Sequence, residues 1–178
     1  VRLIDHTRAV MDCARRLVED LGFPEELRHA VILAAQFHDL GKRRELWQRS
    51  IGNPNPSEWY AKGGKPVGEP RWRPMSITTY RHEFGALLDV LDPAQEHLAQ
   101  LTAFPSDMQD VVLHLVAAHH GRARPHFSSE EICDPNHSSR VAEDAAIEAM
   151  RRYARLQRRY GRWALAYIES LLRAADWT

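Results

Sequence analysis

The chain has 178 residues, a length typical of one folded domain, and 44% of them are hydrophobic, which excludes an intrinsically disordered chain. Its 24 basic residues balance 24 acidic residues, so a generally basic nucleic-acid coat and a polybasic membrane binder are excluded, although a local basic patch is not. Two cysteines, Cys13 and Cys133, form neither a disulfide framework nor a thiolate zinc site, which favours a reducing, cytoplasmic compartment. No apolar run has membrane-spanning length and no signal-peptide pattern is present, so we expect no membrane association.

Hydrophobic periodicity predicts helices through most of the chain. Asp5 is the predicted N-cap of a first helix that ends at Gly22, and Pro24 opens a second helix that ends at Gly41. The predicted apolar stripe of the first helix consists of Val10, Cys13, Ala14, Leu17, Val18 and Leu21. Further helices are predicted over 43–51, 80–91, 93–101, 106–120, 140–160 and 162–177. We therefore expect an all-α bundle of seven or eight helices.

Residues 52–74 interrupt the helical pattern with five of the ten prolines and four of the nine glycines. This long loop carries Lys62, Lys65, Arg71 and Arg73 together with Trp59, Tyr60 and Trp72. Cations for a phosphate backbone and aromatic rings for base stacking are what single-strand binding needs. A solvated loop with no ligand is the alternative interpretation.

A second basic stretch lies in the predicted helix over 140–160 and just beyond it. It consists of Arg151, Arg152, Arg155, Arg158, Arg159 and Arg162. We expect a solvated helix face or a docking surface for another domain here, rather than a DNA contact.

Ten histidines are many for this length, and half of them fall into an ordered set with two aspartates. The set of candidate metal ligands is His6, His38, Asp39, His82, His119, His120 and Asp176. Imidazole and carboxylate ligands without thiolate suit manganese, iron, cobalt, nickel or zinc. Seven ligands are too many for one tetrahedral ion and suit two, with Asp39 as the carboxylate that bridges them. Two such ions suit phosphodiester hydrolysis.

Asp176 follows the apolar residues Leu165, Ile168 and Leu172 at helical spacing. The carboxylate is therefore predicted on a buried stripe, where a charge is costly unless it is paired or bound to a metal. A frayed last helical turn that exposes Asp176 to water is the alternative. The other histidines, His29, His97, His114, His126 and His137, are interpreted as ordinary surface or core residues.

The ordered motifs resemble the HD superfamily of metal-dependent phosphohydrolases. The run HDLGK (38–42) carries the HD pair, with His6 before it and Asp176 near the end, in the order of the family. RHE (81–83), HHG (119–121) and the aromatic-Gln pair Trp47-Gln48 make the chain most similar to the HD nuclease domain of CRISPR type I interference, which is usually fused to a DNA helicase. The resemblance implies an HD helical bundle, with residues 1–178 as a single nuclease domain excised from a helicase protein or acting as its partner.

The resemblance also implies an activity, a cofactor and partners. The activity is a metal-dependent endonuclease or exonuclease on single-stranded DNA, in an antiviral complex with a helicase and the CRISPR effector. The implied cofactor is two divalent transition ions: one held by His6, His38, Asp39 and Asp176, the other by Asp39, His82, His119 and His120. Asp39 and Lys42 are the implied catalytic residues, with Lys42 placing the scissile phosphate or the attacking water. On spacing alone, Lys42 is equally a cation placed at a helix C-terminus.

Two other functions remain open. One is an HD phosphohydrolase that acts on nucleotides or cyclic nucleotides, which the absence of a GYP signature and the basic loop with its aromatics disfavour. The other is a non-catalytic HD-fold module that docks a partner, which seven filled ligand positions disfavour. No GxxxxGK[ST] phosphate loop is present, so the ATP-driven helicase is expected elsewhere.

Overall fold

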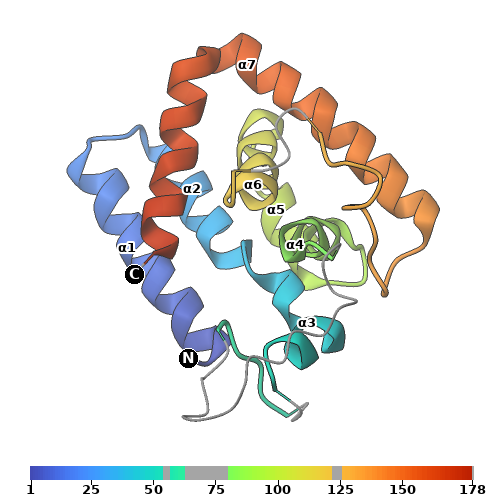
Figure 1. Ribbon diagram of the computed structural model, residues 1–178. Helices are drawn as coiled ribbons and strands as arrows, with labels where there is room; N and C mark the ends of the chain where they lie inside the picture. Colours follow the sequence, from blue (N-terminus) through green and yellow to red (C-terminus); the bar gives the residue numbers. More distant parts are fainter. Residues whose placement is uncertain (54–56, 63–79, 122–125, 178) are drawn as a thin grey trace.

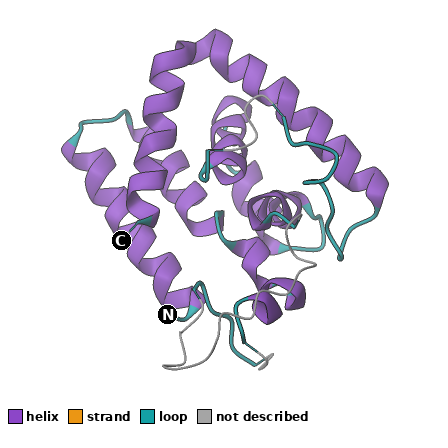
Figure 2. Ribbon diagram, viewed as in Figure 1, coloured by secondary structure: helices purple, strands orange, loops and turns teal. Residues whose placement is uncertain are grey.

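The computed structural model describes residues 1–53, 57–62, 80–121 and 126–177. This part of the chain is helical and contains no strand (Figure 2), so the predicted all-α fold is confirmed. The helices are α1 (Leu3–Asp20), α2 (Glu25–Phe37), α3 (Glu45–Ser50), α4 (His82–Leu91), α5 (Glu96–Thr102), α6 (Ser106–Ala118) and α7 (Ser139–Asp176), with the 3-10 helix η1 (Leu40–Arg43) between α2 and α3. None of the helices described is both long and apolar enough to cross a membrane.

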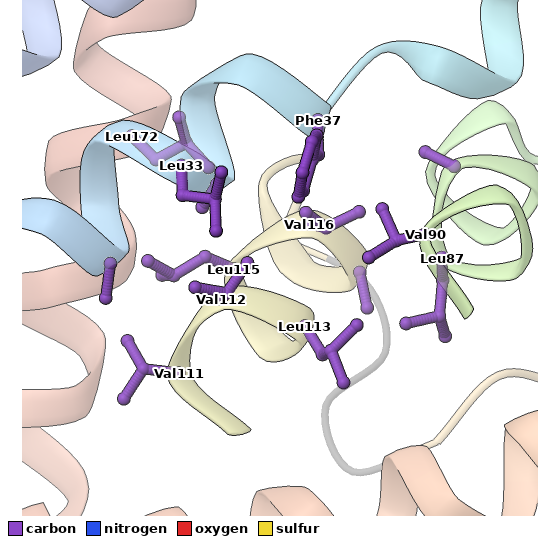
Figure 3. Close-up of a cluster of buried hydrophobic side chains, with 14 of the residues drawn as sticks. Leu33, Phe37, Leu87, Val90, Val111, Val112, Leu113, Leu115, Val116 and Leu172 are labelled. Carbon is purple, nitrogen blue, oxygen red and sulfur yellow. The ribbon is translucent and has the colours of Figure 1, made fainter. Parts of the chain in front are cut away.

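Helix α6 forms the middle of the bundle. It packs against α2, α4, α5 and α7, and α1 lies against α2 and α7 (Figure 1). Figure 3 shows the apolar cluster that results, with Phe37 from α2, Leu87 from α4, Val116 from α6 and Leu172 from α7. Every residue of α6 from Val111 to Ala118 is buried, and all of them except His114 are apolar, so this part of the helix is covered on all sides.

The first helix begins at Leu3, so the prediction that Asp5 caps it is wrong. The start of α1 is fixed by a distant segment instead: the Leu3 amide donates to the Trp59 carbonyl at 2.7 Å, and Arg2 pairs with Tyr60. Asp5 lies within the first turn, bonded to Arg2 at 2.7 Å. A long-range backbone contact of this kind leaves no local sequence signal.

The inner stripe of α1 is confirmed in part. Val10, Ala14 and Val18 are buried, whereas Leu21 is exposed. His6 extends the stripe toward the N-terminus and is buried as well.

The second helix ends at Phe37, before the predicted stop at Gly41. The chain tightens into η1, which packs on α4. A Cβ atom at Gly41 would lie 2.0 Å from the His82 carbonyl oxygen and 2.8 Å from the Ala86 amide nitrogen. Glycine is therefore required for the close approach of η1 to α4, not for a positive φ angle.

Helix α7 is broken at Gly161, which has φ 73° and ψ 169°. The break separates the two helices that the sequence predicts over 140–160 and 162–177. In Figure 1, α7 arches over the bundle and turns back toward α1 where its colour passes from orange to red. This return brings Asp176 to the inner stripe of α1.

The basic stretch of α7 is largely neutralised by carboxylates. Arg155 pairs with Asp110 at 2.7 Å and with Glu148 at 2.6 Å, and Arg159 pairs with Asp107. Arg152 is buried and its Nε lies 3.5 Å from Asp110. Part of the predicted solvated face therefore fastens α7 to α6.

Candidate metal centre

Five separate segments bring the seven candidate ligands together. The ligands lie at His6 in α1, His38 and Asp39 after α2, His82 at the start of α4, His119 and His120 after α6, and Asp176 at the end of α7. All are buried except His120. Their ligand atoms fall into two groups, each with its atoms within 4.8 Å of one another.

The first group consists of His6, His38, Asp39 and Asp176. The Nε2 atom of His6 lies 3.0 Å from Asp176 Oδ1 and 3.4 Å from Asp39 Oδ2. The Nε2 atom of His38 lies 3.4 Å and 3.3 Å from the same two oxygens. Ligands about 2.1 Å from one ion stand roughly 3.0–3.4 Å apart in octahedral or tetrahedral geometry. The four separations therefore match the first coordination shell of one transition ion.

The second group consists of His82, His119 and His120, and it faces the other oxygen of Asp39. Asp39 Oδ1 lies 3.4 Å from His82 Nε2 and 3.9 Å from His119 Nε2, and the Nε2 atoms of His82 and His120 are 3.0 Å apart. Each oxygen of Asp39 thus faces one ligand group. This is the arrangement required of a bridging carboxylate.

Hydrogen bonds at the far side of two rings orient them for metal binding. His38 Nδ1 donates to the Ala35 carbonyl at 2.7 Å, and His119 Nδ1 donates to the Val116 carbonyl at 2.8 Å. The Nε2 lone pair of the neutral ring then points into the site, as in metal-ligating histidines. His38 Nε2, His119 Nε2 and Asp39 Oδ1 are buried without a hydrogen-bond partner. Buried polar atoms are rarely left unpaired, so these three atoms fit a bound cation.

The pKa values of the histidines are shifted in opposite directions in the two ligand groups. Hydrogen bonds to Asp176 and Asp39 raise the pKa of His6; burial opposes the charge of His38, but the same carboxylates raise its pKa to about 10. Burial and then the neighbouring His38 and His120 rings lower the pKa of His119, which keeps that ring neutral. Without an ion, protons on the first group therefore balance its carboxylates, and a metal must displace them.

Lys42 belongs to the same site. It is buried, with its Nζ atom 2.7 Å from Asp39 Oδ2. It thus contacts the carboxylate that faces both ligand groups and does more than place a cation near the end of a helix.

A buried polar network behind the ligands had no recognisable motif in the sequence. Arg44 donates to Asp89 at 2.6 Å and to Asp134 at 3.1 Å, and the Tyr80 hydroxyl donates to the Gly41 carbonyl at 2.7 Å. These bonds join the end of η1 to α4 and to the segment that precedes α7. They hold His38-Asp39 and His82 in fixed relation.

The remaining histidines lie outside both ligand groups. His29 and His126 are exposed. His114 is buried and bonds Glu169 of α7 at 2.7 Å, and His137 bonds Asp134 at 3.1 Å. Spacing within one helix could not reveal the acidic partner of His114.

Of the loop residues predicted to bind nucleic acid, Trp59, Tyr60 and Lys62 lie within the described residues; Lys62 is exposed, and Trp59 and Tyr60 are half-buried. Lys65, Arg71, Trp72 and Arg73 lie outside them. The segment 59–61 that precedes Lys62 is bonded through its backbone to residues 1–3, at the start of α1.

An all-helical bundle that gathers histidines and aspartates around a His-Asp pair is an HD-superfamily domain. Among protein-family models, the one described as Cas3, HD domain matches residues 2–178. The chain therefore belongs to this family, the HD nuclease domain of Cas3 in CRISPR type I systems, and the resemblance seen in the sequence is confirmed. No curated protein and no solved structure gave a significant match.

Proposed function

We propose that residues 1–178 form a single cytoplasmic nuclease domain that hydrolyses phosphodiester bonds of single-stranded DNA with two divalent transition ions. The observation that carries this proposal is Asp39, whose two oxygens face separate ligand groups. One ion is assigned to His6, His38, Asp39 and Asp176, and the other to Asp39, His82, His119 and His120. Manganese, iron, cobalt, nickel and zinc all suit these ligands.

Two bound ions supply Lewis acidity toward the phosphate and lower the pKa of water. The protein's own contribution is to hold the ligands in place and to add charge. Asp39 would hold both ions, and the Nδ1 bonds of His38 and His119 keep their Nε2 atoms directed inward. Lys42, next to Asp39, adds positive charge where negative charge develops on the phosphate during hydrolysis.

The proposed partners are based on the family and on the absence of a GxxxxGK[ST] phosphate loop from this sequence. The domain is proposed to act with a helicase, fused or separate, and with the CRISPR effector complex. The cations and ring of the 52–74 loop, namely Lys62, Lys65, Arg71, Trp72 and Arg73, are proposed to contact the DNA strand. The placement of segment 59–61 next to the start of α1 supports this assignment.

The test is cleavage of a single-stranded oligonucleotide by the purified protein with Mn²⁺, Co²⁺ or Ni²⁺. Activity is expected for the wild-type protein and for His29→Ala, an exposed histidine on α2. Loss of activity is expected for Asp39→Ala. Full metal loading without cleavage of any single-stranded DNA would refute the proposal.

The same assay separates the two other functions. Faster turnover of free or cyclic nucleotides than of oligonucleotides would assign a small-molecule phosphohydrolase. Elemental analysis that finds no transition metal after loading would assign a non-catalytic docking module.

A further inference from the structure

The adjacent residues Trp47 and Gln48 of α3 lie next to the metal centre: Trp47 packs against the ring of His82, and Gln48 bonds the backbone of Lys42, whose ammonium contacts Asp39. We infer that they are positioning residues with divided tasks, in which Gln48 holds the first ligand group and Trp47 holds the second. The inference rests on the proposed two-ion centre.

The side chain of Gln48 is buried and fully hydrogen-bonded. Its Nε2 donates to the carbonyls of Lys42 at 2.7 Å and Tyr60 at 2.9 Å. Its Oε1 accepts from the Tyr60 amide at 3.1 Å and from Asn53 Nδ2 at 2.7 Å. Two donors and two acceptor positions are all that a glutamine amide offers, so no capacity is left for a direct role in chemistry.

These bonds lead to the Oδ2 side of Asp39. The neighbours of Tyr60 pair with the start of α1, through Leu3 N to Trp59 O at 2.7 Å and Ala61 N to Val1 O at 3.0 Å. His6 lies within the first turn that this pairing fixes.

The Lys42 carbonyl, the other acceptor of Gln48, belongs to the residue whose ammonium contacts Asp39 Oδ2 at 2.7 Å. Gln48 therefore helps to fix the positions of two neighbours of Asp39 Oδ2, His6 and Lys42, relative to each other.

Trp47 acts on the Oδ1 side. The centroid of its ring lies 4.7 Å from that of His82, with the planes tilted by 52°. Within the described residues its buried Nε1 has no hydrogen-bond partner, so packing alone orients the ring. His82 faces Asp39 Oδ1 at 3.4 Å, and removal of the ring would free His82 to rotate. The Lys42 ammonium lies 5.6 Å from the same ring, but it is held by its ion pair with Asp39.

The test measures Mn²⁺ affinity by calorimetry in two backgrounds that each retain one ligand group. In His82→Ala, where the first group remains, Gln48→Leu is expected to weaken binding by about 10–100-fold, as loss of an outer-shell partner typically does, and Trp47→Leu to leave it unchanged. In His6→Ala, where the second group remains, Trp47→Leu is expected to weaken binding by the same factor and Gln48→Leu to leave it unchanged. Equal effects of both substitutions in both backgrounds, or no effect of either, would overturn the inference.

Conservative variants separate positioning from folding. Trp47→Phe keeps an aromatic ring against His82 and is expected to restore the affinity that Trp47→Leu loses. Gln48→Glu keeps the size and acceptors of the side chain but loses both donors, so it is expected to weaken the first group without unfolding the protein, as circular dichroism will show. A normal affinity in Gln48→Glu would overturn the role of Gln48. Because the readout is metal affinity, absence of DNA cleavage would refute the proposed function and leave this inference intact.

Discussion

Gly41→Ala is the sharpest probe of how the fold spaces the two ligand groups. The added methyl group would stand 2.0 Å from the His82 carbonyl oxygen and 2.8 Å from the Ala86 amide nitrogen. Both obstructing atoms belong to the backbone of α4 and cannot rotate away. Real Cβ contacts are essentially never shorter than 3.0 Å, so η1 and α4 must separate by about 1 Å.

The separation has two consequences. Overpacking of a close contact costs about 1–3 kcal/mol, and we expect the upper end because backbone must move. The same shift carries His82 away from Asp39, whereas metal–ligand distances tolerate only about 0.2 Å. The second ion is therefore expected to be lost while the first is retained.

Urea denaturation and calorimetric Mn²⁺ titration of Gly41→Ala measure both consequences. Gly22→Ala is the matched control, because Gly22 has φ 65° and nothing within 4 Å of an added Cβ. Its cost is conformational, about 1–2 kcal/mol, and its metal stoichiometry is expected to be unchanged. A Gly41→Ala protein with wild-type stability and two bound ions would refute the reasoning.

Three further outcomes are expected. Although burial opposes its charge, neighbouring carboxylates raise the pKa of His38 from 6.5 to about 10, so the protonated ring stabilises the metal-free protein fully below pH 6.5 and this contribution is lost as the pH rises through 10. Thermal unfolding from about pH 6 to pH 10 should show falling stability without metal, and the apparent Mn²⁺ affinity should rise over the same range because binding displaces a proton from His38. Arg44→Met leaves the carboxylates of Asp89 and Asp134 without their shared guanidinium and should cost about 3–5 kcal/mol in urea denaturation. Arg155→Ala breaks partly exposed ion pairs and should cost at most about 1 kcal/mol, with no change in DNA affinity by fluorescence anisotropy.

The predictions that succeeded are those for which the sequence carries a local signal. Leu165, Ile168, Leu172 and Asp176 follow helical spacing, and all four are buried. The break at Gly161 likewise matches the end of one predicted helix and the start of the next. Such features depend on the spacing of apolar residues and on the positions of glycines a few residues apart, so one sequence is enough to predict them.

The features that were missed depend on contacts between distant segments. The start of α1 at Leu3 depends on the carbonyl of Trp59, and Arg44 has partners 45 and 90 residues away. The acidic partner of the buried His114, Glu169, lies 55 residues further along the chain on another helix. A single sequence does not say which distant polar groups meet.

The kink at Gly161 determines which insertions in α7 would change the direction of the Asp176 side chain. Each residue turns an α-helix by about 100°, so one residue inserted between 162 and 175 would swing the Asp176 carboxylate to another side of its helix. An insertion between 140 and 160 need not be transmitted, because the left-handed backbone at Gly161 resets the helical phase. The long outer arm of α7 can thus change in length while the short inner arm keeps its register with His6.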